Sequence, residues 1–141
     1  SDIAIAADHC RFGLTEVRLG LIPATISPYV LARIGAAQAR RWFINGRFFN
    51  AEQALQMGLL HEVVPADDLD AVVEKELNSI LNAAPTAISL SKGLITQMMA
   101  APAQDPLDFT IEQLADAWET DEAEVGIQAF FAKTPPPWRK S

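Results

Sequence analysis

Apolar side chains recur with helical spacing through the second half of the chain. After Pro65 they fall at positions i, i+3, i+4, i+8, i+11 and i+12, which predicts an amphipathic helix; these residues are Leu69, Val72, Val73, Leu77, Ile80 and Leu81. Three further helices with apolar stripes are expected to begin at Pro85, at Asp105-Pro106 and at Asp121. The prolines after Thr134 cannot continue a helix, so the last one should end before them.

The first 65 residues mix short strands with helices. A nearly continuous apolar run over Asp2–Ala7 predicts a strand buried on both faces, and Leu59–Val64 predicts another, closed by Pro65. The segment 12–17 supplies one more short strand or a turn. Because three strands spread over so many residues do not make a sheet with two covered faces, we expect an N-terminal portion of the domain to be missing from this chain.

Residues that start and end helices are found between these strands. Ser27-Pro28 predicts a helix start, with Ser27 as N-cap and Pro28 at the first helical position, and Gly35 predicts its end. A second helix over about Ala36 to Ile44 should end at the turn pair Asn45-Gly46. Asn50, with Gln53 three residues later, resembles a capping box at the start of another short helix.

The chain is expected to have two unequal parts. Residues 1–65 are typical of the end of an α/β core, and residues 66–141 of a helical extension. The apolar helix faces are too many for an isolated appendage, which favours packing on another subunit or on the missing core.

Charge and cysteine content narrow the function classes. Lys and Arg total 11 against 18 Asp and Glu, for a net charge of −7, which argues against binding to nucleic acid or to anionic membranes. Apolar stretches are far shorter than the ~20 residues that span a bilayer. The single cysteine, Cys10, is expected to be a small core residue, and no Cys/His spacing predicts a metal site. With no leader visible, we expect a cytoplasmic protein.

Glu16 is the strongest candidate for chemistry. It lies between apolar residues and two glycines, and a carboxylate held against apolar side chains can hold or release a proton near neutral pH. The alternative is a glutamate on the rim of a turn that pairs with Arg18 or caps the next helix. His9 and His61 are isolated and are expected to be surface or capping residues.

The chain resembles the enoyl-CoA hydratase/isomerase (crotonase) family over essentially its whole length. The residues that carry the resemblance are the run Ile5–Pro23, Gly35, Asn45-Gly46, Ala51, Ala54, Gly58-Leu59, Val63-Val64-Pro65, the Lys92 helix and the closing run Gly126–Lys133. By this resemblance the chain is about the C-terminal half of a family member.

The resemblance implies a fold and a substrate. It implies an α/β fold, the C-terminal part of a spiral of ββα turns followed by a helical trimerisation and CoA-covering region, so that this chain itself is mainly helical. The full-length protein would form a trimer or a dimer of trimers. The CoA thioester would be the substrate, with no separate cofactor, and two backbone N–H groups upstream of this chain would stabilise its developing enolate oxygen.

The resemblance also assigns residues. Glu16 matches the second of two glutamates that position and activate water for addition across the double bond. Leu14 matches a position that faces the acyl group, and Ala24 replaces a glycine whose N–H touches the catalytic water. Phe130 and Lys133 match last-helix positions that reach CoA. Each residue also has a structural explanation, because Phe130 belongs to the apolar stripe of the helix and Lys133 ends a helix, where a cation is favoured.

The finer pattern is similar to bacterial methylglutaconyl-CoA and isohexenylglutaconyl-CoA hydratases of leucine and acyclic-terpene breakdown. It consists of Leu14-Thr15-Glu16-Val17 followed by the stretch from Ala24 to Val30. Such substrates carry a second carboxylate, for which Arg18 and Arg33 are candidate partners. Two alternatives stay open: double-bond isomerisation through the same enolate, and an inactive chain that serves only as an oligomerisation module. The isolated chain is expected to be inactive and to self-associate.

Overall fold

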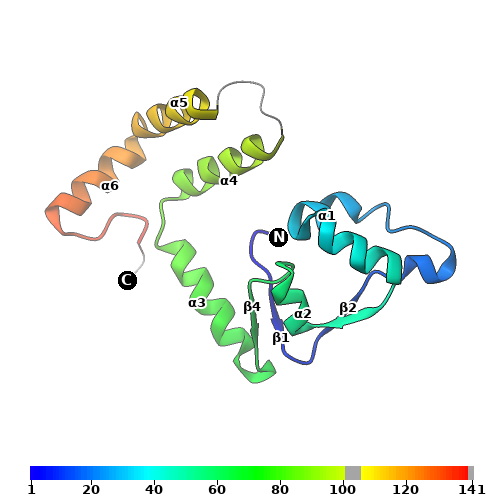
Figure 1. Cartoon of the computed structure of the whole chain (residues 1–141). Coiled ribbons are helices and arrows are strands. Elements are labelled where there is room, and N and C mark those ends of the chain that lie inside the picture. Colours follow the sequence, from blue (N-terminus) through cyan, green and yellow to red (C-terminus); the bar gives the residue numbers. More distant parts are fainter. Residues whose placement is uncertain (101–105, 140–141) are drawn as a thin grey trace. The chain divides into compact units, whose positions relative to one another are not determined.

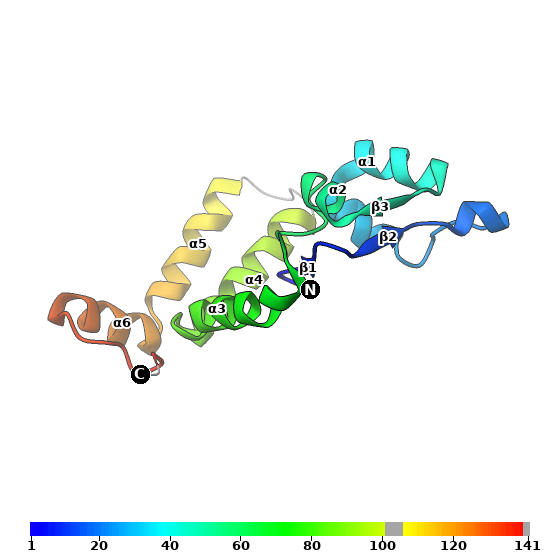
Figure 2. The same cartoon turned by 90° about the horizontal axis from the view of Figure 1, so that it is seen from below.

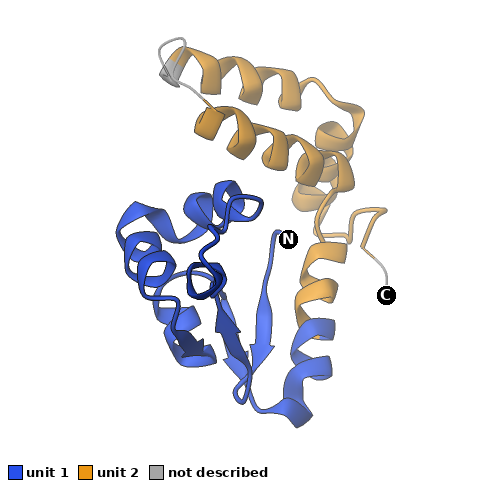
Figure 3. Cartoon of the chain, turned by 90° about the vertical axis from the view of Figure 1, so that its right-hand side faces the viewer, with its two compact units in different colours: residues 1–74 blue, residues 75–141 orange. Residues whose placement is uncertain are grey.

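The computed structural model describes residues 1–100 and 106–139, and these residues form two compact units, one from Ser1 to Glu74 and the other from Lys75 onward (Figure 3). The sequence predicts a boundary after residue 65, whereas the structure places it after Glu74, inside helix α3 (Leu69–Leu81). Most of the helices and strands are labelled in Figure 1, and Figure 2 shows them from below. Most of the described residues are helical, which confirms the expectation of a mainly helical chain.

Four short strands form two separate pairs in the described part of the first unit. Strand β1 (Ile5–Ala7) runs parallel to β4 (Glu62–Val64), and both lie within segments that the sequence predicts. Strand β2 (Arg11–Gly13) runs antiparallel to β3 (Phe48–Asn50), with Gly13 opposite Phe48. No pattern along the sequence predicts β3.

Helix α1 (Ser27–Asn45) is interrupted where the sequence predicts an end. Gly35 has φ 71° and ψ 166°, outside the helical region, so α1 consists of two helical pieces joined at this glycine. The prediction of Ser27 as N-cap is wrong by one position, because Ile26 is the N-cap and Ser27 already belongs to the helix. The Ser27 hydroxyl donates instead to the carbonyl of Ala24, at 2.9 Å.

The predicted capping box opens helix α2 (Ala51–Gln56). The Asn50 side chain accepts a hydrogen bond from the Gln53 N–H (2.9 Å), and the Gln53 side chain accepts one from the Asn50 N–H (3.1 Å). Both bonds satisfy N–H groups that the first helical turn leaves unpaired. The capped helix buries Ala51 and Ala54 completely.

The core of the first unit gathers around α2. Its buried members come from both strand pairs, from α1 and from α2, and are Ala6, Leu14, Val30, Ile34, Ala39, Trp42, Phe49, Ala51, Ala54, Met57 and Leu60. The rings of Trp42 and Phe49 lie 4.8 Å apart, at an angle of 49°. Cys10 is half-buried against this core, as expected for a small apolar side chain. Two short 3-10 helices, η1 (Glu16–Leu19) and η2 (Ala66–Asp68), complete the unit.

Three helices pack against one another in the second unit: α4 (Pro85–Ala100), α5 (Pro106–Trp118) and α6 (Asp121–Ala132). Each follows a prediction from the sequence, although the expected cap at Asp105 lies outside the described residues. The Thr120 hydroxyl accepts from the Ala123 N–H (3.2 Å) and so caps α6. The Glu122 carboxylate accepts from the Ala87 N–H (3.1 Å), which ties α6 to the first turn of α4.

Large apolar side chains stay exposed on α5 and α6, as the sequence predicts. Trp118 is 64% exposed, and Phe130 and Phe131 are each 78% exposed. Among the helices described, none is both long enough and apolar enough to cross a membrane.

Candidate functional site

Glu16 is the first residue of η1, and its carboxylate is the most unusual polar group of the first unit. The side chain is half-buried, and its Oε2 atom is buried with no hydrogen-bond partner among the described residues. The carbonyl of Glu16 accepts from the Leu21 N–H (3.0 Å), so the backbone of this residue is fixed by the turn that ends η1. A buried, unpaired carboxylate oxygen is free to accept a proton or a hydrogen bond from a bound molecule.

The ion pair between Glu16 and Arg18 that the sequence leaves open is not found. Among the described residues, the ion pair that is found joins Nδ1 of His9 to Oδ1 of Asp8, at 3.6 Å. The Arg18 guanidinium lies instead over the ring of Phe48, with Cζ 5.7 Å from the ring centroid. Arg18 therefore has an aromatic partner on β3 rather than the carboxylate two residues away.

The two expected acyl-site residues lie in different surroundings. Leu14 is 8% exposed and belongs to the core of the first unit, so its contact with an acyl group stays a prediction. Ala24 is exposed, and its N–H donates to the carbonyl of Ile22 at 2.8 Å. The N–H that was expected to be available to a catalytic water is thus engaged within the chain.

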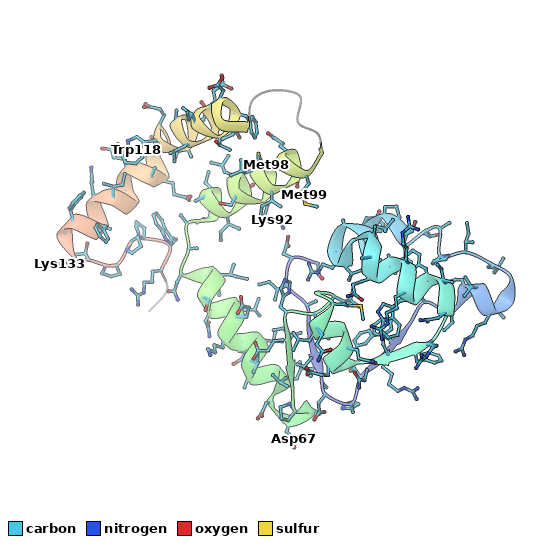
Figure 4. All side chains as sticks on the ribbon, viewed as in Figure 1. Asp67, Lys92, Met98, Met99, Trp118 and Lys133 are labelled. Atoms are coloured by element: carbon cyan, nitrogen blue, oxygen red, sulfur yellow. The ribbon has the colours of Figure 1, made fainter. Side chains whose placement is uncertain are left out.

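Phe130 and Lys133 lie at the end of α6 in the second unit. Lys133 is labelled in Figure 4. The ring of Phe130 packs edge-to-face on Phe131, with centroids 5.6 Å apart, and most of its surface is open. Lys133 ends the helix with φ 55°, and its N–H donates to the Phe130 carbonyl (3.2 Å). Both side chains are accessible to a ligand, and their contact with CoA stays a prediction.

Arg33 lies against an imidazole. Its Nη2 atom is 3.1 Å from Nδ1 and 3.3 Å from Nε2 of His61, and Nδ1 also accepts a hydrogen bond from the Ala4 N–H (2.9 Å). His61 is exposed, as expected of an isolated histidine, and its ring binds the backbone ahead of β1. Its position before β4 explains why it reaches the residue before β1, since these two strands are neighbours.

An apolar cavity of about 310 Å³ lies among the helices of the second unit. Its walls are mostly alanine, leucine and tryptophan side chains of α4, α5 and α6, and Trp138 also lines it. The one carboxylate in its lining, that of Glu122, already accepts from the Ala87 N–H. In the part of the chain that the structure describes, no group of three or more His, Cys, Asp or Glu side chains is placed to hold a metal ion.

Sequence reasoning missed Phe48, whose ring lies against Gly13. Phe48 is 52% exposed while its neighbour Phe49 is 3% exposed, an alternation that is typical of a strand. A signal was present in Gly46-Arg47-Phe48-Phe49, but two alternating positions are too few to identify a strand without its partner.

Comparison with known proteins gives consistent matches. The sequence model of the Enoyl-CoA hydratase/isomerase family matches residues 1–141. The short-chain-enoyl-CoA hydratase of Clostridium acetobutylicum is 31% identical over 133 residues, which are 94% of this chain and 51% of that protein.

Solved structures agree with the sequence matches. An enoyl-CoA hydratase from Shewanella pealeana has 38% identity and a TM-score of 0.90, over 98% of this chain and 52% of its own. Pseudomonas aeruginosa AtuE has 37% identity and a TM-score of 0.92, over 99% of this chain and 55% of its own. The chain thus spans about half the length of the relatives it matches.

Proposed function

Because the chain belongs to the enoyl-CoA hydratase/isomerase family, we propose that the full-length protein adds water to an enoyl-CoA thioester, with Glu16 as a general acid/base group. The match of residues 1–141 and the order of the motifs support this proposal. The placement of the chain in the C-terminal half of that protein stays a prediction, which the gene sequence upstream of Ser1 will test.

The observation that carries the proposal is the burial of the Glu16 carboxylate without a hydrogen-bond partner among the described residues. Its Oε2 is buried and, among the described residues, has no hydrogen-bond partner, so a bound water can use it. In hydration the carboxylate takes a proton from water as the oxygen bonds to the β-carbon of the enoyl group. The electron pair of the double bond moves toward the thioester carbonyl, and a proton is then delivered to the α-carbon.

A second glutamate is expected to share this work with Glu16. By the resemblance it lies upstream of the present chain, together with both N–H donors to the thioester oxygen. Whether a glutamate stands there also distinguishes the main alternative, isomerisation, in which a proton moves between two carbons and no water is added. The remaining alternative is an inactive chain that serves only in oligomerisation, and no observation favours either over hydration.

The proposed acyl group is branched and carries a second carboxylate, as in methylglutaconyl-CoA. The support is the similarity of the Glu16 segment and of the stretch after Pro23 to hydratases of such substrates. Arg18 has an exposed side chain, and a guanidinium that lies over a ring keeps its N–H groups free to bind a carboxylate. Arg33 is half-buried, and its Nη2 already lies against His61, which leaves its remaining N–H groups for this role. The proposed reaction belongs to leucine or acyclic-terpene breakdown in the cytoplasm.

The second unit is proposed to cover the CoA moiety within a trimer or a dimer of trimers. Lys133 is suited to a phosphate because its ammonium group lies on an exposed helix end. The exposed ring of Phe130 offers an apolar surface next to it. No separate cofactor is proposed, since the CoA thioester is itself the substrate.

Replacement of Glu16 in the full-length enzyme tests the proposal. Glu16→Gln keeps the size of the side chain but cannot take a proton from water, so the hydration rate should fall by ~10²-fold or more while CoA-ester binding largely survives. Glu62→Gln, on the exposed side of β4, is the matched control and should leave the rate unchanged. An unchanged rate in Glu16→Gln would reject the assignment, and product without water incorporation would favour isomerisation.

A further inference from the structure

The Phe48 side chain contacts the segment that carries Glu16 on both sides of that residue. On the preceding side, Phe48 is paired with Gly13 across strands β2 and β3. On the following side, its ring lies under the guanidinium of Arg18, 5.7 Å from Cζ to the ring centroid. One aromatic ring therefore packs on the chain three residues before Glu16 and two residues after it.

The contact with Gly13 leaves no space for a side chain at that position. A Cβ atom added to Gly13 would lie 2.7 Å from Cδ1 and 2.9 Å from Cε1 of Phe48. It would also lie 3.2 Å from Cγ2 of Thr15, the residue that precedes Glu16. The ring thus lies directly on the backbone where the chain leaves β2 toward η1.

The contact with Arg18 is electrostatic. A guanidinium within about 6 Å of a ring centroid is attracted by the negative face of the ring, and Arg11 lies over the same ring at 5.3 Å. Neither arginine is in an ion pair with a carboxylate in the described part of the chain. The ring is therefore the partner that orients Arg18 and keeps its charge directed toward β3.

Gly46 supports the same segment from a second side. A Cβ atom added there would lie 2.9 Å from Cγ2 of Val17 and 3.2 Å from Cγ of Arg18. The end of α1 and the start of β3 thus pack on the two residues that follow Glu16. Because the described residues offer Oε2 of Glu16 no hydrogen bond, the position of this oxygen depends on where these contacts hold the backbone of η1.

We infer that Phe48 is a positioning residue for the hydration proposed above. It acts through Gly13 and Arg18 to fix η1, and so sets where the Glu16 carboxylate meets the water and the double bond. Phe48 itself does not touch the reacting atoms. The inference rests on the proposed role of Glu16, and it predicts that loss of the ring lowers turnover rather than substrate binding.

The test compares two substitutions of Phe48 in the full-length enzyme, with a linear enoyl-CoA that lacks a second carboxylate. Phe48→Leu keeps an apolar side chain but removes the aromatic face, and kcat should fall about tenfold with KM nearly unchanged, because small displacements of a catalytic group are costly. Phe48→Tyr keeps the ring face and should retain kcat within about twofold. An unchanged kcat in a folded Phe48→Leu enzyme overturns the inference.

A double-mutant cycle with Glu16 separates positioning from a general structural effect. If Phe48 acts through Glu16, Phe48→Leu should cause no further loss of kcat in the Glu16→Gln enzyme. A full additional tenfold loss would overturn the inference while leaving the proposed function intact. An unchanged rate in Glu16→Gln alone would reject the proposed function and the inference together.

Arg18→Met provides a second route should Phe48→Leu fail to fold. Methionine keeps an apolar stem beside Gly46 and removes the charge that the ring orients. The same fall in kcat is expected, again with none in the Glu16→Gln background. A kcat equal to that of the wild-type enzyme would contradict the role of the ring and guanidinium contact.

Discussion

His61 binds both polar groups of the Ala4 backbone, 57 residues earlier in the chain. The Nδ1 atom of its ring accepts from the Ala4 N–H at 2.9 Å, and the backbone N–H of His61 donates to the Ala4 carbonyl at 2.8 Å. These bonds extend the pairing of β1 with β4 by one position before Ile5 and Glu62. The pairing of the two strands therefore depends in part on a side chain and not on the backbone alone.

Removal of the imidazole should weaken this end of the strand pair. His61→Leu leaves the Ala4 N–H without its acceptor, and we expect the free energy of unfolding to fall by about 1 kcal/mol. Urea denaturation of the full-length protein measures the change. His9→Leu is the matched control, because His9 is exposed and its contact with Asp8 at 3.6 Å contributes little. Equal effects of the two substitutions would contradict the prediction.

The capping box of α2 should contribute measurably to stability. Asn50→Ala removes the acceptor for the Gln53 N–H and should lower the free energy of unfolding by about 1 kcal/mol. Asn50→Asp keeps a carbonyl-type oxygen in the same place and should be nearly neutral. The prediction fails if the aspartate variant loses as much stability as the alanine variant.

This capping box was predictable because both residues lie within four positions of each other. By contrast, β3 has three residues, and its partner β2 precedes it by the whole of η1 and α1, so no local pattern identifies the pair. The observed N-cap of α1 differs from the predicted one by one residue, because the Ser27 hydroxyl donates to the Ala24 carbonyl instead of accepting from an N–H group of the helix. Competing local hydrogen bonds of this kind are open to serine everywhere.

Two glycine-to-alanine substitutions should have opposite effects. Gly35 has φ 71° and ψ 166°, a conformation essentially restricted to glycine, so Gly35→Ala should destabilise the protein by about 1–3 kcal/mol. Gly93 lies within α4, with nothing within 4 Å of an added Cβ, so Gly93→Ala should stabilise the protein by about 0.5–1 kcal/mol. Thermal unfolding gives the sign of both, and the same sign in both would contradict the prediction.

The isolated chain 1–141 should self-associate through the exposed faces of α5 and α6. Apolar surface left in water costs about 25 cal/mol per Å², which favours its burial against a second copy. Light scattering at micromolar concentration should give a mass above that of one chain. Trp118→Glu and Phe131→Glu together should lower that mass. Asn78→Glu, at an exposed position of α3, is the control and should leave the mass unchanged. A stable monomer of the unchanged chain would contradict this expectation.

The sequence identified Glu16 as a candidate but could not describe its surroundings. The distance along the chain suggested Arg18 as its partner, whereas the structure places that guanidinium over Phe48, a residue brought close by β3. Likewise the resemblance suggested that Ala24 offers its N–H to a water, whereas in the structure this N–H donates to the Ile22 carbonyl. Both differences arise from contacts and turns that depend on the folded backbone, which residue types alone do not encode.

The boundary between the two units falls inside α3, and this has a consequence for proteolysis. A protease binds its substrate in an extended form, so it cannot cut a helical backbone unless the helix first opens. Lys75, the first residue of the second unit, is an exposed trypsin site held within α3. The rate at which trypsin cuts after Lys75 should therefore report how often α3 unfolds locally.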